Sequence, residues 1–147
     1  MLCAAMAAMA FGASGQSEVS YDWIDLGLPS GVLWASHNVG ANKPDEFGDH
    51  FAWGETEPKS EYRIGNYRYF DGDKNRITKY CNNPIYGKDG YTDSLTVLEP
   101  MDDVATIKWG SGARTPTMDE WYELMENTMG KVDTLNGVSG YRFTAAN

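Results

Sequence analysis

The clearest periodic pattern in the chain lies near its C-terminal end and predicts an amphipathic helix over residues 118–129. Apolar side chains recur there at intervals of three or four, and acidic side chains fall on the opposite face. Thr117 and Glu120 have the spacing of a capping box, so the helix should begin directly after Thr117. Gly130 should end it. The apolar face is predicted to consist of Met118, Trp121, Leu124, Met125 and Met129.

Strand patterns are short and come in two pairs. Residues 22–26 alternate polar and apolar side chains, and residues 32–35 form a second run after a turn, so the two should pair like a hairpin. Residues 132–135 and 141–144 lie on either side of Asn136-Gly137, a dipeptide that favours tight hairpin turns. With the helix, these strands predict an α+β domain.

Three weaker patterns lie between the two strand pairs. A brief apolar run at residues 51–54 predicts a buried segment, and residues 96–98 predict a short strand. Residues 100–108 predict a short helix, because a proline suits the first turn and acidic side chains there complement the helix dipole.

Residues 62–91 show neither a helical nor a strand period. Tyrosine, asparagine and glycine are frequent, and six basic against three acidic residues give this segment a charge of +3 in a chain of net charge −9. Long irregular segments are usually functional or disordered. A mixture of rigid aromatic and adaptable polar side chains is typical of binding surfaces. Alternatively, the tyrosines hold a long loop onto the body of the domain, and the sequence leaves both interpretations open.

Composition limits the partners and the core. The chain of 147 residues has the length of one domain, and its net charge of −9 argues against sequence-independent binding to nucleic acid, which needs basic side chains on the phosphates. Valine, isoleucine, leucine and phenylalanine supply only 23 of residues 16–147, whereas the chain has five tryptophans and nine tyrosines. We therefore expect a loop-rich fold in which aromatic rings form much of the core.

Residues 1–15 have the composition of a secretory signal peptide. Twelve of the fifteen are apolar, none is charged, and small residues at Ala13-Ser14-Gly15 or Ala10-Phe11-Gly12 suit cleavage. The basic residue that usually precedes the apolar run is missing, and the run is too short to span a bilayer. A buried N-terminal helix is the alternative interpretation. We expect export, with residues 16–147 as the mature domain.

The cysteines predict neither a disulfide nor a lipid anchor. Cys81 is the only cysteine of residues 16–147, so an internal disulfide is excluded there, and the expected role of Cys81 is that of a small buried side chain. Cys3 begins the apolar run, whereas the modified cysteine of a lipoprotein ends it.

The catalytic and metal-binding motifs that the sequence suggests are all incomplete. Ser30 lacks the glycines of a nucleophile elbow, and His37 and His50 make a weak zinc set. Residues 71–75 begin like a calcium loop, but Arg76 stands where an EF-hand has glycine. We expect no catalytic residue, metal or cofactor. A calcium site of another type stays open for Asp45, Glu46, Asp49, Asp102 and Asp103.

Several segments, in order, resemble the Fibrobacter succinogenes major paralogous domain. The longest is YDWIDLGLPSGVLWA at residues 21–35. The combination is specific although each segment is short, and it covers about residues 21–147. The other matching segments are residues 38–41 (NVGA), 47–55 (FGDHFAWGE), 98–105 (LEPMDDVA), 109–110 (WG), 114–121 (RTPTMDEW) and 136–144 (NGVSGYRFT).

This resemblance implies a C-type-lectin-like fold, related in architecture to the sulfatase-modifying-factor domains. Members of the family are exported or surface proteins, mostly of undefined function, so the expected location is the periplasm or outer surface of a Gram-negative bacterium. The family continues after the strand at residues 141–144 with an apolar strand, a Gly- and Tyr-rich loop and a last strand. Residues 16–147 are therefore expected to be the N-terminal portion of such a domain, and fold alone does not fix function.

The expected function is that of a non-catalytic binding module for a glycan or a surface protein, without nucleic acid or a membrane span. Glycans stack on aromatic faces, so exposed tyrosines of the irregular segment are the candidate ligand-binding residues. A structural or assembly component is the alternative. An enzyme of the formylglycine-generating type is less favoured, because its late cysteines or metal-ligating histidines have no counterpart here. The candidate tyrosines are Tyr67, Tyr69, Tyr86 and Tyr91.

Overall fold

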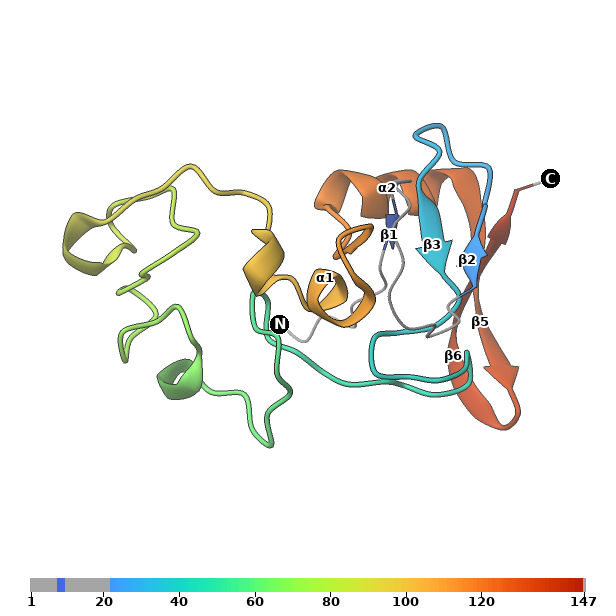
Figure 1. Ribbon diagram of the computed structural model, residues 1–147, viewed down its shortest axis with the longest axis horizontal. Helices are drawn as coiled ribbons and strands as arrows, with labels where there is room; N and C mark the ends of the chain where they lie inside the picture. The colour runs from blue at the N-terminus through green and yellow to red at the C-terminus, as the bar shows by residue number, and fades with distance from the viewer. Residues whose placement is uncertain (1–7, 10–21, 147) are drawn as a thin grey trace.

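The computed structural model describes residues 8–9 and 22–146 as a mixed α+β arrangement of few helices and short antiparallel strands (Figure 1). The strands are β1 Ala8–Met9, β2 Trp23–Ile24, β3 Leu33–Ala35, β4 Ala113–Arg114, β5 Thr128–Leu135 and β6 Val138–Ala145. The α-helices are α1 Val104–Trp109 and α2 Met118–Asn127, and the 3-10 helices are η1 Ile64–Asn66, η2 Lys88–Gly90 and η3 Pro100–Asp102.

A four-stranded sheet in the order β2-β3-β1-β4 collects strands from distant parts of the chain. The predicted pairing of β2 with β3 is confirmed, with Trp23 opposite Ala35. Strand β1 lies between β3 and β4 and is antiparallel to both, so Ala8 faces Trp34 on one side and Arg114 on the other. The predicted signal peptide therefore contributes two residues to this sheet, and its other residues lie outside the described part of the chain.

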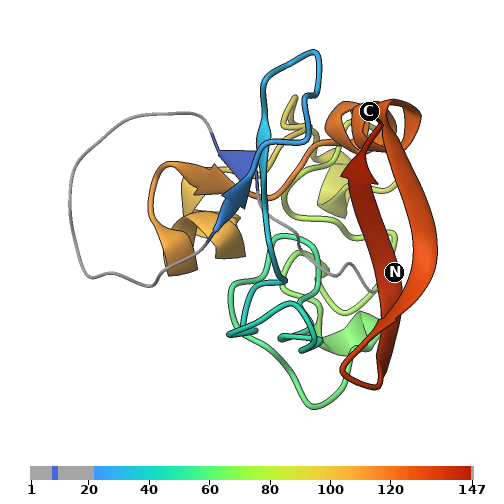
Figure 2. The same cartoon turned by 90° about the vertical axis from the view of Figure 1, so that its right-hand side faces the viewer.

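The predicted C-terminal hairpin is confirmed and is longer than expected. Strands β5 and β6 have eight residues each and pair along their whole length, from Thr128 opposite Ala145 to Leu135 opposite Val138. Asn136 and Gly137 both have positive φ, which is the conformation that a tight type I′ turn requires. The hairpin forms one side of the molecule, and the irregular segment extends away from it on the other side (Figures 1 and 2).

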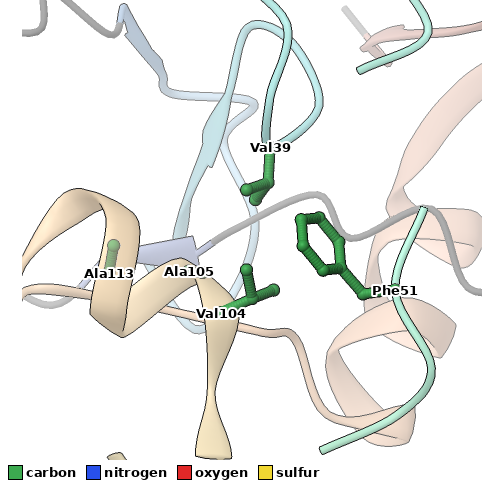
Figure 3. Close-up of a cluster of buried hydrophobic side chains, with 5 residues drawn as sticks. All are labelled: Val39, Phe51, Val104, Ala105 and Ala113. Atoms are coloured by element: carbon green, nitrogen blue, oxygen red, sulfur yellow. The ribbon is translucent and has the colours of Figure 1, made fainter. Parts of the chain in front are cut away.

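Two hydrophobic clusters form the core. The first lies where α1 and β4 meet the loops around residues 39 and 51 (Figure 3). Trp23 and Trp109 pack against it and meet each other edge to face. The second lies under α2, where the ring of Trp34 is 5.0 Å from that of Trp121. Aliphatic and aromatic side chains thus share the core. The buried members are Val39, Phe51, Val104, Ala105 and Ala113 in the first cluster and Leu26, Leu28, Trp34 and Leu124 in the second.

The helix at residues 118–129 is confirmed at its start and corrected at its end. Thr117 Oγ1 accepts from the Glu120 backbone N–H at 3.3 Å, and Glu120 Oε2 accepts from the Thr117 N–H at 2.8 Å. The helix stops at Asn127, before Gly130, because strand β5 begins at Thr128. Of the predicted apolar face, Leu124 is buried and Trp121 half-buried, whereas the three methionines are exposed.

Two of the weaker expectations also need correction. Residues 96–98 form no strand, and the predicted helix over residues 100–108 divides into η3 and α1. Asp103 separates the two, because its side chain accepts from the backbone N–H groups of Ala105 and Thr106 and so caps α1. The same carboxylate accepts from the backbone and hydroxyl of Thr115, which attaches α1 to the segment after β4.

Candidate functional site

A hollow of about 470 Å³, here called the aromatic cleft, opens between residues 51–53 and residues 59–80. Its walls are mostly rings, with a few long polar side chains, which is the usual make-up of a small-molecule site. The lining residues are Phe51, Ala52, Trp53, Lys59, Tyr62, Arg63, Ile64, Asn66, Tyr67, Phe70, Ile77, Lys79 and Tyr80.

Three tyrosine hydroxyls hold the irregular segment against residues 50–54. Tyr62 donates to the carbonyl of His50, Tyr67 donates to that of Trp53 at 2.9 Å, and Tyr69 donates to that of Gly54 at 3.2 Å. Each bond satisfies a carbonyl in a stretch that lacks regular secondary structure. The interpretation that tyrosines fasten a long loop to the body therefore holds for these three residues.

The rings of the cleft also brace one another. Trp53 and Tyr80 meet edge to face with their centroids 4.7 Å apart, and Tyr67 and Phe70 do so at the same separation. Tyr69 lies 5.4 Å from Tyr80 and completes the cluster. Such pairs contribute roughly 0.5–1.5 kcal/mol each beyond the area they bury. The cleft is thus preformed in spite of its irregular backbone.

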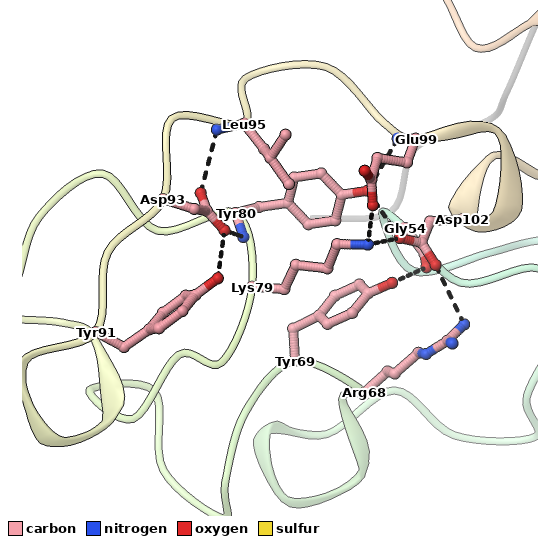
Figure 4. Close-up of polar contacts among 10 residues, drawn as sticks. All are labelled: Gly54, Arg68, Tyr69, Lys79, Tyr80, Tyr91, Asp93, Leu95, Glu99 and Asp102. Carbon is pink, nitrogen blue, oxygen red and sulfur yellow. Dashed lines mark hydrogen bonds and ion pairs between the residues drawn. The ribbon is translucent and has the colours of Figure 1, made fainter.

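Asp102 of η3 is the polar centre behind the cleft (Figure 4). Its side chain is 1% exposed and accepts from Lys79 Nζ at 2.5 Å and from the Tyr80 hydroxyl at 2.8 Å, and Arg68 lies 3.5 Å away. Burial alone would raise the pKa of Asp102, but the hydrogen bonds from Lys79, Tyr69 and Tyr80 outweigh it and leave that pKa below its ordinary value. Hydrogen bonds to Asp102 and Glu99 raise the pKa of Lys79, so both partners stay charged near neutral pH.

Asp93 fixes the turn that presents Tyr80. Its carboxylate accepts from the backbone N–H groups of Tyr80 at 2.6 Å, Cys81 at 3.0 Å and Leu95 at 3.2 Å, and from the Tyr91 hydroxyl at 3.0 Å. Burial opposes ionisation, yet these donors lower the pKa of Asp93. Tyr80 has a φ of 60°, a conformation that is uncommon outside glycine. The hydrogen bonds from the backbone N–H groups of Tyr80 and Cys81 to Asp93 hold it in this conformation.

The charged side chains on the walls of the cleft, among the residues that the structure describes, are all basic. They are Lys59, Arg63 and Lys79, although the chain as a whole carries −9. The carboxylates that pair with them stand outside the lining. Lys59 pairs with Glu55 at 2.5 Å, and Arg63 pairs with Glu61 at the same distance.

The four predicted ligand-binding tyrosines have different positions. Tyr67 is half-buried and lines the cleft, where burial, helped by the charge of Glu55, raises its pKa to about 12. Tyr69 is only 6% exposed, so the expectation that its ring is exposed is wrong. Tyr86 and Tyr91 are exposed but lie outside the lining.

The sequence interpretation missed Trp53 as a candidate. The run at residues 51–54 was expected to be buried, and Phe51 and Gly54 are, but the Trp53 side chain is 38% exposed on the wall of the cleft. A tryptophan next to a glycine, before a charged stretch, was the available signal. Phe70 and Tyr62 also line the cleft, and nothing in their spacing indicated it.

The other sequence candidates have ordinary structural roles. Asp71 pairs with Arg76 at 3.0 Å and Lys88 at 3.1 Å, and the Asp73 side chain accepts from the Asn75 N–H. Cys81 is confirmed as a buried, free thiol. Within residues 8–9 and 22–146, no three histidine, cysteine or acidic side chains lie close enough together to hold a metal ion.

A second hollow of about 520 Å³ lies between the β2–β3 strands and the β5–β6 hairpin. Leu26, Trp34 and Phe143 supply apolar walls, and polar and charged side chains such as Ser36, Asp133 and Arg142 line the rest. The aromatic cleft is the stronger candidate, because all the charged side chains among its described lining residues are basic, whereas the second hollow has side chains of both signs.

Comparison with known proteins gives no relative. No protein-family model matches the sequence, and neither a curated protein nor a solved structure matches it. Among the helices in the described part of the chain, none has the length and apolar character needed to cross a membrane.

Proposed function

We propose that this chain is an exported or cell-surface, non-catalytic binding module and that it holds a glycan in the aromatic cleft. The observation that carries the proposal is the partly exposed Trp53 beside half-buried Tyr67, in a preformed hollow of about 470 Å³. The C–H faces of sugars pack on aromatic rings such as these.

The proposal extends to fold family and location. The residue segments that resemble the major paralogous domain, together with short antiparallel strands and few helices, support a C-type-lectin-like fold. The composition of residues 1–15 supports export, and with the resemblance it supports the periplasm or outer surface of a Gram-negative bacterium.

Glycan-array binding of two cleft variants tests this function. Trp53→Ala removes the exposed ring but keeps the backbone carbonyl that accepts from Tyr67. Tyr67→Phe removes that hydroxyl and keeps the ring. We expect Trp53→Ala to weaken binding at least about tenfold, or about 1.4 kcal/mol, and Tyr67→Phe to leave it nearly unchanged, since the ring rather than the hydroxyl contacts the sugar.

The matched control is Tyr86→Ala, which removes an exposed ring outside the cleft. Thermal unfolding of every variant separates lost binding from lost folding. Unchanged glycan binding by folded Trp53→Ala, or loss of binding by Tyr86→Ala alone, would move the site away from the cleft.

A structural or assembly role is the second candidate, and exposed apolar side chains favour it. Met118, Tyr122 and Met125 of α2 lie within one or two turns of one another, and Met129 of β5 follows them. Exposed apolar patches mark interaction surfaces, and methionines adapt to varied partners. Concentration-dependent self-association without glycan binding, abolished by Met125→Glu, would favour this role over the first.

A further inference from the structure

We propose that the ligand of the aromatic cleft is an anionic glycan, in which a sugar carries a carboxylate or a sulfate group, and that the Arg63 guanidinium binds this group. The inference rests on the proposed function and adds the chemical class of the ligand. It comes from the charges that face the cleft and from what each of them is already paired with.

The charged side chains that line the cleft are of one sign in an acidic protein. Among the described residues its walls include Lys59, Arg63 and Lys79 and no acidic side chain, although acidic residues outnumber basic ones 21 to 12 in the whole chain. A cation gains more from an anionic group of a ligand than from a neutral hydroxyl, because charge-assisted hydrogen bonds are the stronger ones. A cleft with one sign of charge on low-dielectric walls concentrates ligands of the opposite sign.

Two of these cations are committed to buried carboxylates. Lys59 holds Glu55, whose side chain is 5% exposed, and Lys79 holds Asp102, whose side chain is 1% exposed. Drawing either lysine away would leave a buried carboxylate without its counter-ion, which is costly. These two lysines therefore keep their present partners, which leaves Arg63 as the cation of the cleft that a ligand can take.

Arg63 is placed differently, at the rim. Its side chain is 70% exposed and its partner Glu61 is 56% exposed. Exposed ion pairs contribute only about 0–1 kcal/mol, so a ligand anion can replace Glu61 at little cost. A guanidinium presents two parallel N–H groups that match a carboxylate or sulfate, and it does so better than a lysine.

The backbone at Arg63 is fixed independently of its side chain. The Arg63 N–H donates to Asn66 Oδ1 at 3.0 Å, and the Asn66 N–H donates to the Arg63 carbonyl at 3.1 Å. Arg63 thus has a fixed backbone directly before η1, next to exposed Ile64, and it lines the same cleft as Trp53. Replacing the side chain should leave the loop in place.

The test uses the full chain and three oligosaccharides of equal length: one containing uronic acids, one sulfated and one neutral. Binding is measured by calorimetry at low and at high salt. We expect the wild type to bind at least one anionic oligosaccharide about tenfold or more tightly than the neutral one, with the preference reduced at high salt. Binding of the uronate alone assigns the carboxylate, and binding of the sulfated sugar alone assigns the sulfate.

Arg63→Gln should abolish most of the preference while keeping the weaker binding of the neutral sugar. Arg142→Gln is the matched control, because Arg142 is another exposed arginine that pairs with a carboxylate, half-buried Asp133, at 3.2 Å and lies on β6 outside the cleft. Equal affinity for neutral and anionic sugars, or an unchanged preference in Arg63→Gln, overturns the inference and leaves the glycan function standing. Absence of binding to all three sugars counts against both.

Discussion

At the scale of single residues, Asp102 connects more of the molecule than any candidate ligand-binding side chain. It joins η3 to three residues of the irregular segment, Arg68, Lys79 and Tyr80, and so fastens the back wall of the cleft to the core. A buried carboxylate is tolerated when all of its hydrogen-bond donors are present. The loss of one donor leaves part of the negative charge uncompensated and destabilises the fold.

Asp102→Asn should lower the free energy of unfolding by about 2 kcal/mol, the usual worth of hydrogen bonds to a charged group. Urea unfolding at neutral pH measures it. Asp89→Asn is the control, because Asp89 pairs with Arg76 on the exposed surface and asparagine tolerates its positive φ. A loss in Asp102→Asn no larger than in the control would show that the Asp102 contacts add little.

The same carboxylate predicts a pH dependence. The pKa of Asp102 is lower in the folded chain than its ordinary value, so its ionised form stabilises the fold above that value. This contribution disappears as the pH falls through the lowered pKa. The stability difference between wild type and Asp102→Asn should therefore shrink on acidification from pH 7 towards pH 3, and a difference that stays constant or grows contradicts the assignment.

The limits of sequence reasoning are also clearest at single residues. Tyr67 and Tyr69 are two positions apart in a segment without a period, so nothing local distinguished the ring on the cleft wall from the buried one. Their difference depends on Trp53, Gly54 and Asp102, which belong to other segments. The sequence indicated Asp102 as a calcium ligand or as an acidic residue in the first turn of a helix, and not as the centre of an ion-pair cluster, because its partners lie more than 20 positions away in sequence.

At the scale of elements, the helix and the hairpin could be predicted because short sequence motifs determine where they begin or turn. The Thr117–Glu120 capping box and the Asn136-Gly137 turn each act over a few residues, and both are present in the structure. The exposure of the α2 methionines did not follow from the sequence, because the periodicity gives a face and only tertiary packing decides how much of that face is covered.

Gly137→Ala tests the turn. Gly137 has a φ of 83° with no neighbouring atom within 4 Å of an added Cβ, so the cost is backbone strain alone. We expect the free energy of unfolding to fall by about 1 kcal/mol, as measured by urea unfolding. Gly65→Ala is the control, because Gly65 also has open space around it but a φ outside the left-handed region. Equal effects at the two sites would contradict a strained turn.

At the scale of the whole molecule, the sheet was the least predictable feature. The fold class and the β2–β3 pair followed from the sequence, but the two-residue strands β1 and β4 have no detectable pattern. Strand β1 pairs with β3, and β4 pairs with β1 across most of the length of the chain. The cleft was equally hidden, because its walls come from residues 51–80 without a regular element between them longer than η1.

Removing residues 1–15 should change the behaviour of the whole chain. Strand β1 pairs on both sides, so its loss leaves β3 and β4 without their shared neighbour. We expect residues 16–147 to unfold about 2 kcal/mol more easily than the full chain, as a few net hydrogen bonds imply, or to self-associate in sedimentation experiments. A chain that lacks only residues 1–5 keeps Ala8–Met9 and serves as control. Equal stability and a monomeric state in both would show that β1 contributes nothing.

Through β1, the proposed export would also link processing of the chain to its assembly. If a peptidase cuts after residue 15, strands β3 and β4 lose the strand that lies between them, and each is left with an edge of unpaired backbone donors and acceptors. The processed chain can then accept an extended segment of another molecule in the place of β1. On this proposal, association follows processing and does not precede it.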